Sequence, residues 1–160
     1  MRLENGINKS DLQRVNQEIF TNPVELMRNI EGVTTYLKKI IKKNGGDPER
    51  ETLNLIPAKD EKYYFVDSKG EYWRSYKYIT DATSYDLVEN PKDFYESAVA
   101  FGHFQKLLSN YPAETLNETI KGFHDTESRL NAFKEAVEKD SFGRAAKVQR
   151  RFSLSLSVKK

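Results

Sequence analysis

The sequence contains no cysteine, which excludes disulfide bonds and thiolate chemistry from its 160 residues. It has no run of about 18 apolar residues and no basic-then-apolar N-terminus, so we expect neither a membrane-spanning helix nor a signal peptide. A chain without cysteine is compatible with a reducing compartment. We therefore expect a cytoplasmic protein that has no membrane partner.

Neither sign of charge dominates, and histidine is scarce. The 26 lysines and arginines nearly balance 24 aspartates and glutamates, for a formal net charge of +2. So small a net field argues against a nucleic-acid partner. His103 and His124 lie far apart without cysteines, so we expect no metal site. His124 and Asp125 could pair a base with an orienting acid, but helix capping explains Asp125, so we assign no catalytic residue.

The clearest pattern that is present is a long amphipathic helix. Asn22 can cap it, Pro23 suits the first helical position, and Asn44 to Gly46 supply a left-handed stop. A loop over Asp47–Glu51 is expected to follow. The apolar stripe includes Leu26, Met27, Ile30, Val33, Leu37, Ile40 and Ile41. Four lysines crowd the last turns: Lys38, Lys39, Lys42 and Lys43. We interpret them as a solvated helix end rather than a phosphate-binding patch.

Strand patterns flank this helix on both sides. Residues around Leu12 favour a short strand, and Thr52–Ile56 favours a second one. Tyr63–Val66 and Glu71–Ile79 are separated by the turn Asp67–Gly70, which predicts a hairpin. Together these segments predict an antiparallel sheet packed on the long helix, and so an α+β fold.

The last strand of this hairpin is rich in aromatic residues. Its two faces alternate between Trp73, Ser75, Lys77, Ile79 and Tyr72, Arg74, Tyr76, Tyr78. Exposed rings of this kind can stack on the bases of single-stranded nucleic acid. Packing of the sheet on the helix explains the rings equally, and the near-neutral charge favours that interpretation.

A polar connector leads to a second long helix. The connector spans Thr80–Glu89, and Asn90 with Pro91 repeats the capping pattern of the first helix. Phe94 and Phe101 mark an apolar stripe that we expect to be buried. Gly102 within this helix indicates close packing.

The remainder of the chain predicts shorter elements. Asp125 is expected to cap a third helix, and Arg144–Gln149 favours a helix. Strict alternation over Phe152–Val158 predicts a strand.

Four segments resemble one known family. They are LQRVNQEIFTNPVELMRNIEGVTTYL, EYWRSYKYI, the SYD…ENPKDFYESAVAFGHFQKLL run and FHDTESR. Together they resemble the N-acetylhexosamine 1-kinase branch of the aminoglycoside phosphotransferase and choline kinase-like superfamily, over Leu12 to about Gln149. The resemblance implies a protein kinase-like small lobe (antiparallel sheet plus one long helix) in residues 1–79, and a hinge or linker in 80–90. It further implies the first helices of a partial large lobe in 91–149, with an atypical tail in 150–160.

The resemblance also implies ligands and contacts. A complete family member is an ATP-dependent sugar kinase that uses ATP and magnesium on an N-acetylhexosamine. Backbone groups of Lys77, Tyr78 and Ile79 would face the adenine. Gln13 or Arg14 would lie where related kinases have a basic residue that contacts phosphate, and Arg14 is the better electrostatic candidate.

The sequence lacks the family's catalytic and metal-binding motifs. The Gly-His-Ile-Asn phosphate loop has at best a remnant in Asn5–Asn8, and the His-Asn-Asp loop and later metal-binding aspartate should follow Lys160. Without those acids we expect a truncated phosphotransferase-like protein that is inactive alone. The alternative is a non-catalytic α+β interaction module that self-associates through exposed helices. The side chains expected to be uncovered are Phe101, Phe104, Phe133 and Val137.

Overall fold

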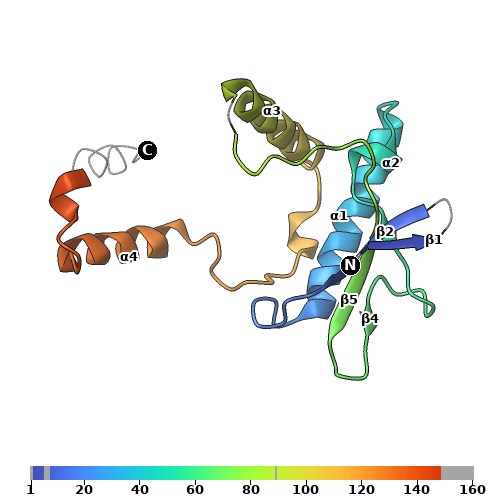
Figure 1. Cartoon of the computed structure of the whole chain (residues 1–160), viewed down its shortest axis with the longest axis horizontal. Helices are drawn as coiled ribbons and strands as arrows, with labels where there is room; N and C mark the ends of the chain where they lie inside the picture. The colour runs from blue at the N-terminus through green and yellow to red at the C-terminus, as the bar shows by residue number, and fades with distance from the viewer. Residues whose placement is uncertain (1, 6–7, 89, 149–160) are drawn as a thin grey trace. The chain divides into compact units, whose positions relative to one another are not determined.

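The computed structural model describes residues 2–5, 8–88 and 90–148 (Figure 1). The chain divides into two units, Met1–Ile120 and Lys121–Lys160. An antiparallel sheet and helices make up the first unit, so the expected α+β class is confirmed. The kinase-like identity of that unit, with its boundaries at residues 79 and 90, stays a prediction.

The elements follow one another with these bounds: β1 (Arg2–Asn5), β2 (Asn8–Arg14), α1 (Pro23–Lys43), α2 (Pro48–Glu51), β3 (Leu55–Ile56), β4 (Phe65–Val66), β5 (Tyr72–Lys77), α3 (Pro91–Leu107), η1 (Ala113–Thr115), α4 (Thr126–Lys139) and η2 (Ala145–Val148). The two η elements are short 3-10 helices.

The central strand of the sheet is β5. The order is β1-β2-β5-β3, β4 also pairs with β5, and every pairing is antiparallel. In the register, Leu12 lies opposite Ser75 and Arg14 lies opposite Trp73. Directly opposed residues share a face of a sheet and side chains alternate along a strand. One face therefore carries these four residues together with Lys77, and we call it the Trp73 face.

The opposite face of the sheet packs on α1 (Figure 1). Tyr76 lies on this face and is buried, and α1 buries Met27, Leu37 and Ile41. The expected start of α1 is confirmed, because the Asn22 side chain accepts a hydrogen bond of 3.2 Å from the Glu25 amide. This helix and the sheet thus share the main core of the first unit.

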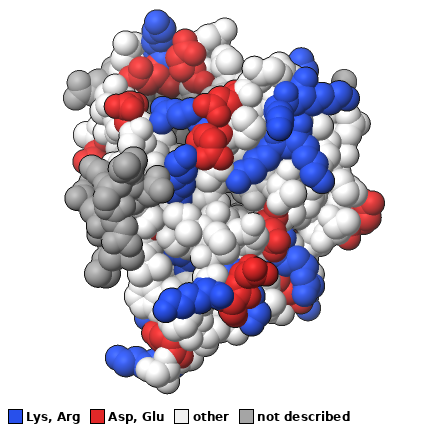
Figure 2. All heavy atoms as spheres, turned by 90° about the vertical axis from the view of Figure 1, so that its right-hand side faces the viewer, with Lys and Arg blue, Asp and Glu red and all other residues white. Residues whose placement is uncertain are grey.

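The end of α1 confirms the predicted stop. Gly45 has a φ of +79°, a conformation that glycine adopts without steric cost. Lys39, Lys42 and Lys43 are exposed, as expected of a solvated helix end. Figure 2 shows one face of the molecule, on which basic and acidic side chains both occur.

Two predictions for the segment after α1 were wrong. The expected loop at 47–51 contains the helical turn α2, because Asp47 caps it by accepting a hydrogen bond of 2.9 Å from the Glu49 amide. The strand expected over 52–56 is confined to β3. Here the buried Asn54 side chain donates to the carbonyls of Pro48, Glu49 and Thr52, which ties this segment to α2 rather than to a longer ladder.

The predicted hairpin is confirmed, although its strands are shorter than expected. The Asp67 amide donates to the Glu71 carbonyl over 3.0 Å, and Gly70 adopts a φ of +78°. This turn joins β4 to β5 and places Asp67 beside the Trp73 face.

The expected packing of α3 was wrong, although its start was right. Asn90 caps it by accepting a hydrogen bond of 3.0 Å from the Lys92 amide. Phe94 is 66% exposed and Phe101 62% exposed, and open space surrounds the position where Gly102 would carry a Cβ. Helical spacing identifies an apolar stripe, but it does not show that another element covers it.

The second unit contains α4, whose predicted cap is confirmed. The Asp125 side chain accepts a hydrogen bond of 2.8 Å from the Ser128 amide. The helix expected over 144–149 is the short η2. The strand predicted at 152–158 lies outside the described residues, as do Gly6 and Ile7 of the expected phosphate-loop remnant.

Candidate functional site

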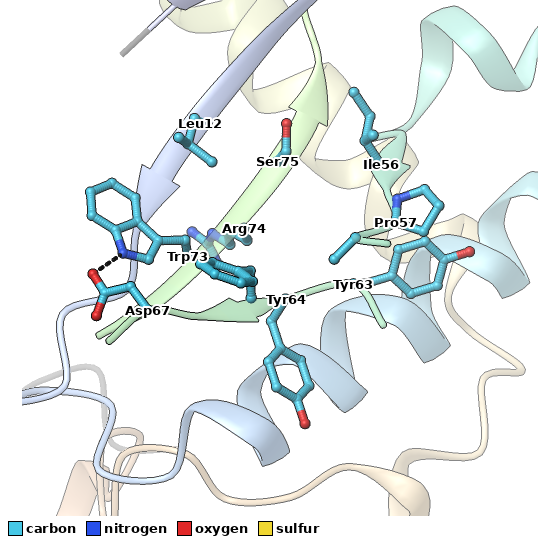
Figure 3. A pocket seen from close by; sticks show the side chains of 11 residues that line it. Leu12, Ile56, Pro57, Tyr63, Tyr64, Asp67, Trp73, Arg74 and Ser75 are labelled. Carbon is cyan, nitrogen blue, oxygen red and sulfur yellow. Dashed lines mark hydrogen bonds between the residues drawn. The ribbon is translucent and has the colours of Figure 1, made fainter. Parts of the chain in front are cut away.

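The Trp73 face carries a pocket of about 460 Å³ (Figure 3). Strands β2, β3, β4 and β5 and the segment between β3 and β4 contribute to its walls. The residues that line it are Leu12, Ile56, Pro57, Ala58, Tyr63, Tyr64, Phe65, Asp67, Trp73, Arg74 and Ser75. Most are aromatic or aliphatic, so the pocket suits a flat, largely apolar chemical group.

One side of the pocket is fixed by Trp73 and Asp67 (Figure 3). The indole Nε1–H of Trp73 donates to Oδ2 of Asp67 over 2.9 Å. The other carboxylate oxygen accepts from the backbone amides of Lys69 (2.8 Å) and Glu71 (3.0 Å). The β4–β5 turn therefore holds the carboxylate, and the carboxylate holds the edge of the indole.

The same contacts control the ionisation of Asp67. The hydrogen bond from Trp73 lowers the pKa of the Asp67 carboxyl below its ordinary value, and the amides of Glu71 and Lys69 act in the same direction. Because the folded state has the lower pKa, the stabilisation is complete above the unfolded-state pKa. It is lost as pH falls through the folded-state pKa.

This linkage predicts an acid transition at Trp73. As pH falls below the ordinary carboxyl range, protonation of Asp67 should release the indole and change the emission of Trp73, the single tryptophan. Asp67→Asn should remove this change, because asparagine has no carboxyl group that becomes protonated in this pH range. Asp60→Asn, a control at another carboxyl of lowered pKa, should retain it. Identical titration curves for Asp67→Asn and the unaltered protein would contradict the assignment.

Arg14 lies beside the pocket, at the end of β2. Its Nη1 donates to Oε2 of Glu71 over 2.8 Å, in a pair that solvent reaches. Gln13 lies on the opposite face and accepts from Nε and Nη2 of Arg74, each over 3.3 Å. Of the two phosphate-contact candidates, Arg14 is therefore the one on the pocket face.

The end of β5 holds the other predicted site residues. The Nζ of Lys77 donates to Oε2 of Glu49 over 2.6 Å, and its amide donates to the Asn54 carbonyl over 2.8 Å. Tyr78 is partly buried and Ile79 is 46% exposed. These contacts fix the end of the strand against α2, at the point where the connector begins.

The structure does not bring Arg14 next to the Lys77–Ile79 segment. Arg14 lies opposite Trp73, and four residues of a strand span roughly 13 Å between Trp73 and Lys77. Ser75, which lines the pocket, lies between them on the same face. The predicted contacts thus flank the pocket at its two ends.

Sequence reasoning missed most of the pocket lining. Leu12, Ile56 and Phe65 converge on β5 only because three different strands pair with it. Asp67 gave a local signal, since an aspartate that begins a Gly-bearing turn beside an alternating aromatic strand can reach the strand's rings.

The histidines take no part in this pocket. His103 and His124 are exposed, and the ring of His124 packs edge-on against Phe123 at 4.9 Å between centroids. Among residues 2–5, 8–88 and 90–148, no group of three His, Cys, Asp or Glu side chains could hold a metal ion.

No protein-family model matches the chain. Within the part of the chain that the structure describes, none of the helices is both long and apolar enough to cross a membrane.

Proposed function

We propose that Met1–Ile120 contains a nucleotide-binding lobe of the kinase-like phosphotransferase type that the sequence resembles, with ATP as the ligand. One observation carries the proposal: Arg14 and Lys77 lie on the same sheet face, with an aromatic pocket between them. A nucleotide has a flat base at one end and phosphates at the other, so it matches an aromatic pocket with the Arg14 guanidinium beside it.

The base is assigned to the pocket. Stacking of a base on an aromatic side chain contributes about 1–3 kcal/mol, and the indole of Trp73 is already held in place by Asp67. Tyr63 and Phe65 supply further ring surface. A base stacked on Trp73 would lie roughly 13 Å from Lys77, whose amide already donates to the Asn54 carbonyl, so the backbone of Lys77–Ile79 is not assigned to the edge of a base in this pocket.

The phosphates are assigned to Arg14. A guanidinium can donate two parallel hydrogen bonds to a phosphate, whereas Lys77 would act as a point charge. Magnesium commonly binds through substrate phosphates and one or two carboxylates. Glu71 is already paired with Arg14, so the ion is assigned to the phosphates rather than to this carboxylate.

The pairing of Arg14 with Glu71 predicts the effect of a charge-removing substitution. Glu71→Gln should strengthen ATP binding up to about fivefold, because the carboxylate competes with phosphate for an exposed guanidinium. Titration calorimetry would measure this, with Glu18→Gln as a control of equal charge change. Weaker binding by Glu71→Gln would show instead that Glu71 contacts the ligand or its metal ion.

We propose that the protein binds ATP in the cytoplasm without phosphorylating a sugar. The 160 residues of the chain contain no His-Asn-Asp sequence, which the resembled kinases use to orient the acceptor hydroxyl. Calorimetry with ATP and magnesium, beside a coupled assay with an N-acetylhexosamine, tests both parts. Binding of ATP without sugar phosphorylation is expected. Absence of binding would overturn the nucleotide assignment, and turnover would overturn the assignment as non-catalytic.

A second candidate function is a non-catalytic interaction module. It is favoured by the exposed rings of Phe94, Phe101 and Phe104 on α3, because apolar patches of this kind drive association. Light scattering after size exclusion should then show a mass that rises with concentration, and Phe101→Ser should reduce the rise. A constant monomer mass would contradict self-association.

A further inference from the structure

Two asparagines far apart in the sequence join α1 to the segment that follows α3. The side-chain Nδ2 of Asn29 donates to the backbone carbonyl of Asn117 over 2.8 Å. In return, Oδ1 of Asn29 accepts from the Asn117 backbone amide (2.9 Å) and from its side-chain Nδ2 (3.0 Å). The two residues are 88 positions apart and partly buried, so this pair is a specific tertiary contact.

An aromatic contact lies on the same side of α1. The ring of Tyr111 meets the ring of Tyr36 edge-on, with centroids 5.2 Å apart. A Cβ placed on Gly32 would lie 2.7 Å from the Tyr111 hydroxyl oxygen, closer than two such atoms can approach. The missing side chain of Gly32 therefore makes room for the tyrosine, and a glycine inside α1 has a structural reason.

The stretch between the end of β5 and Tyr111 has little other support in the described residues. Its first part is held where Nη1 of Arg50 donates to the Thr80 carbonyl over 2.8 Å. The helix α3 that follows has no buried residue. Regions with few buried apolar contacts open at low free-energy cost, so the contacts at the two ends decide how firmly this stretch is held.

We propose that Asn29, Gly32, Tyr111 and Asn117 form a clasp, and that its opening releases the stretch from 90 to 117, which contains α3, as one unit while the sheet and α1 stay folded. The clasp is a conformational device that is independent of nucleotide binding. When it opens, the α1 surface around Asn29 and Gly32 loses its cover, and the hydrogen bond from Arg50 still holds the start of the connector at Thr80.

Hydrogen exchange of the full chain tests the clasp directly, since the Asn117 amide is itself one of the bonded groups. In Asn29→Ala, which removes all three hydrogen bonds of the pair, amides of 111–117 should exchange at least about tenfold faster, which corresponds to about 1.4 kcal/mol. Amides in the core of α1, such as those of Leu37 and Ile41, should keep their rates. Asn110→Ala, at an exposed neighbouring asparagine, is the matched control and should change neither set.

Gly32→Ala distinguishes opening of the clasp from unfolding of α1. Hydrogen exchange should become faster in 111–117 but not in α1. Alanine favours the helix interior over glycine, so α1 amides should exchange no faster. The new methyl group should displace the Tyr111 hydroxyl and speed exchange in 111–117. In a double-mutant cycle, Asn29→Ala combined with Asn117→Ala should exceed Asn29→Ala alone by no more than about twofold, because the one hydrogen bond of the Asn117 side chain is already lost in Asn29→Ala. Unchanged rates in 111–117 for Gly32→Ala and Asn29→Ala, or equal acceleration throughout α1, would overturn the proposal.

Discussion

Trp73→Ala should weaken ATP binding roughly 5- to 150-fold, which corresponds to the loss of about 1–3 kcal/mol of base stacking. The indole forms one wall of the pocket and is oriented by its hydrogen bond to Asp67. Removing it takes away the aromatic plane and leaves the Asp67 carboxylate without that donor. Both changes act against a bound base, so this substitution should have the largest effect on binding.

Two variants make the measurement specific. Trp73→Phe keeps a ring but loses the indole N–H, so its affinity should lie between those of the unaltered protein and Trp73→Ala. Tyr85→Ala removes an exposed ring of the connector, which does not line the pocket, and should leave affinity unchanged. Titration calorimetry with ATP and magnesium would compare all four proteins. Equal affinities for Trp73→Ala and the unaltered protein would place the nucleotide elsewhere.

Ile41→Ala should have the largest effect on stability, with a loss of about 2–5 kcal/mol from the free energy of unfolding of the first unit. Ile41 is only 2% exposed and belongs to the buried face of α1. Replacement by alanine removes three carbons and leaves a cavity where the helix meets the sheet. A loss of this size is a large share of the total stability of a small domain.

Urea denaturation followed by Trp73 fluorescence measures this effect. The single tryptophan lies in β5, so its signal reports the first unit and avoids treating the two units as one cooperative transition. Ile19→Ala provides the matched control, because Ile19 is 53% exposed and its truncation should change stability by about 0.5 kcal/mol or less. A similar small change for Ile41→Ala would mean that α1 does not pack on the sheet as described.

The starts of α1, α3 and α4 and the hairpin could be predicted from the sequence because they depend on neighbouring residues. An asparagine followed by proline begins both α1 and α3, and Asp125 begins α4 by the same physical rule. The left-handed glycine at 70 closes the turn between β4 and β5. In each case the determining feature is local: a side chain caps backbone amides a few positions away, or a glycine adopts the backbone angle that the turn requires.

The pocket and the clasp could not be predicted because they depend on contacts between distant segments. Gln13 and Arg14 were equal candidates by position, and only the pairing of Arg14 with Trp73 assigns Arg14 to the pocket face. Asn29 and Asn117 carry no local signal that joins them across 88 positions. The exposure of α3 is a further case, since an apolar stripe has the same spacing whether or not another element covers it.

The central claim is that the Trp73 face of the sheet binds a nucleotide, and an NMR titration of the full chain with ATP and magnesium tests it most directly. We predict saturable chemical-shift changes of the Trp73 indole N–H and of the amides of Leu12, Ser75 and Lys77. In Arg14→Gln, half-saturation should require a higher ATP concentration. Shifts confined to α1 or α3, or no shifts at millimolar ATP, would contradict the account.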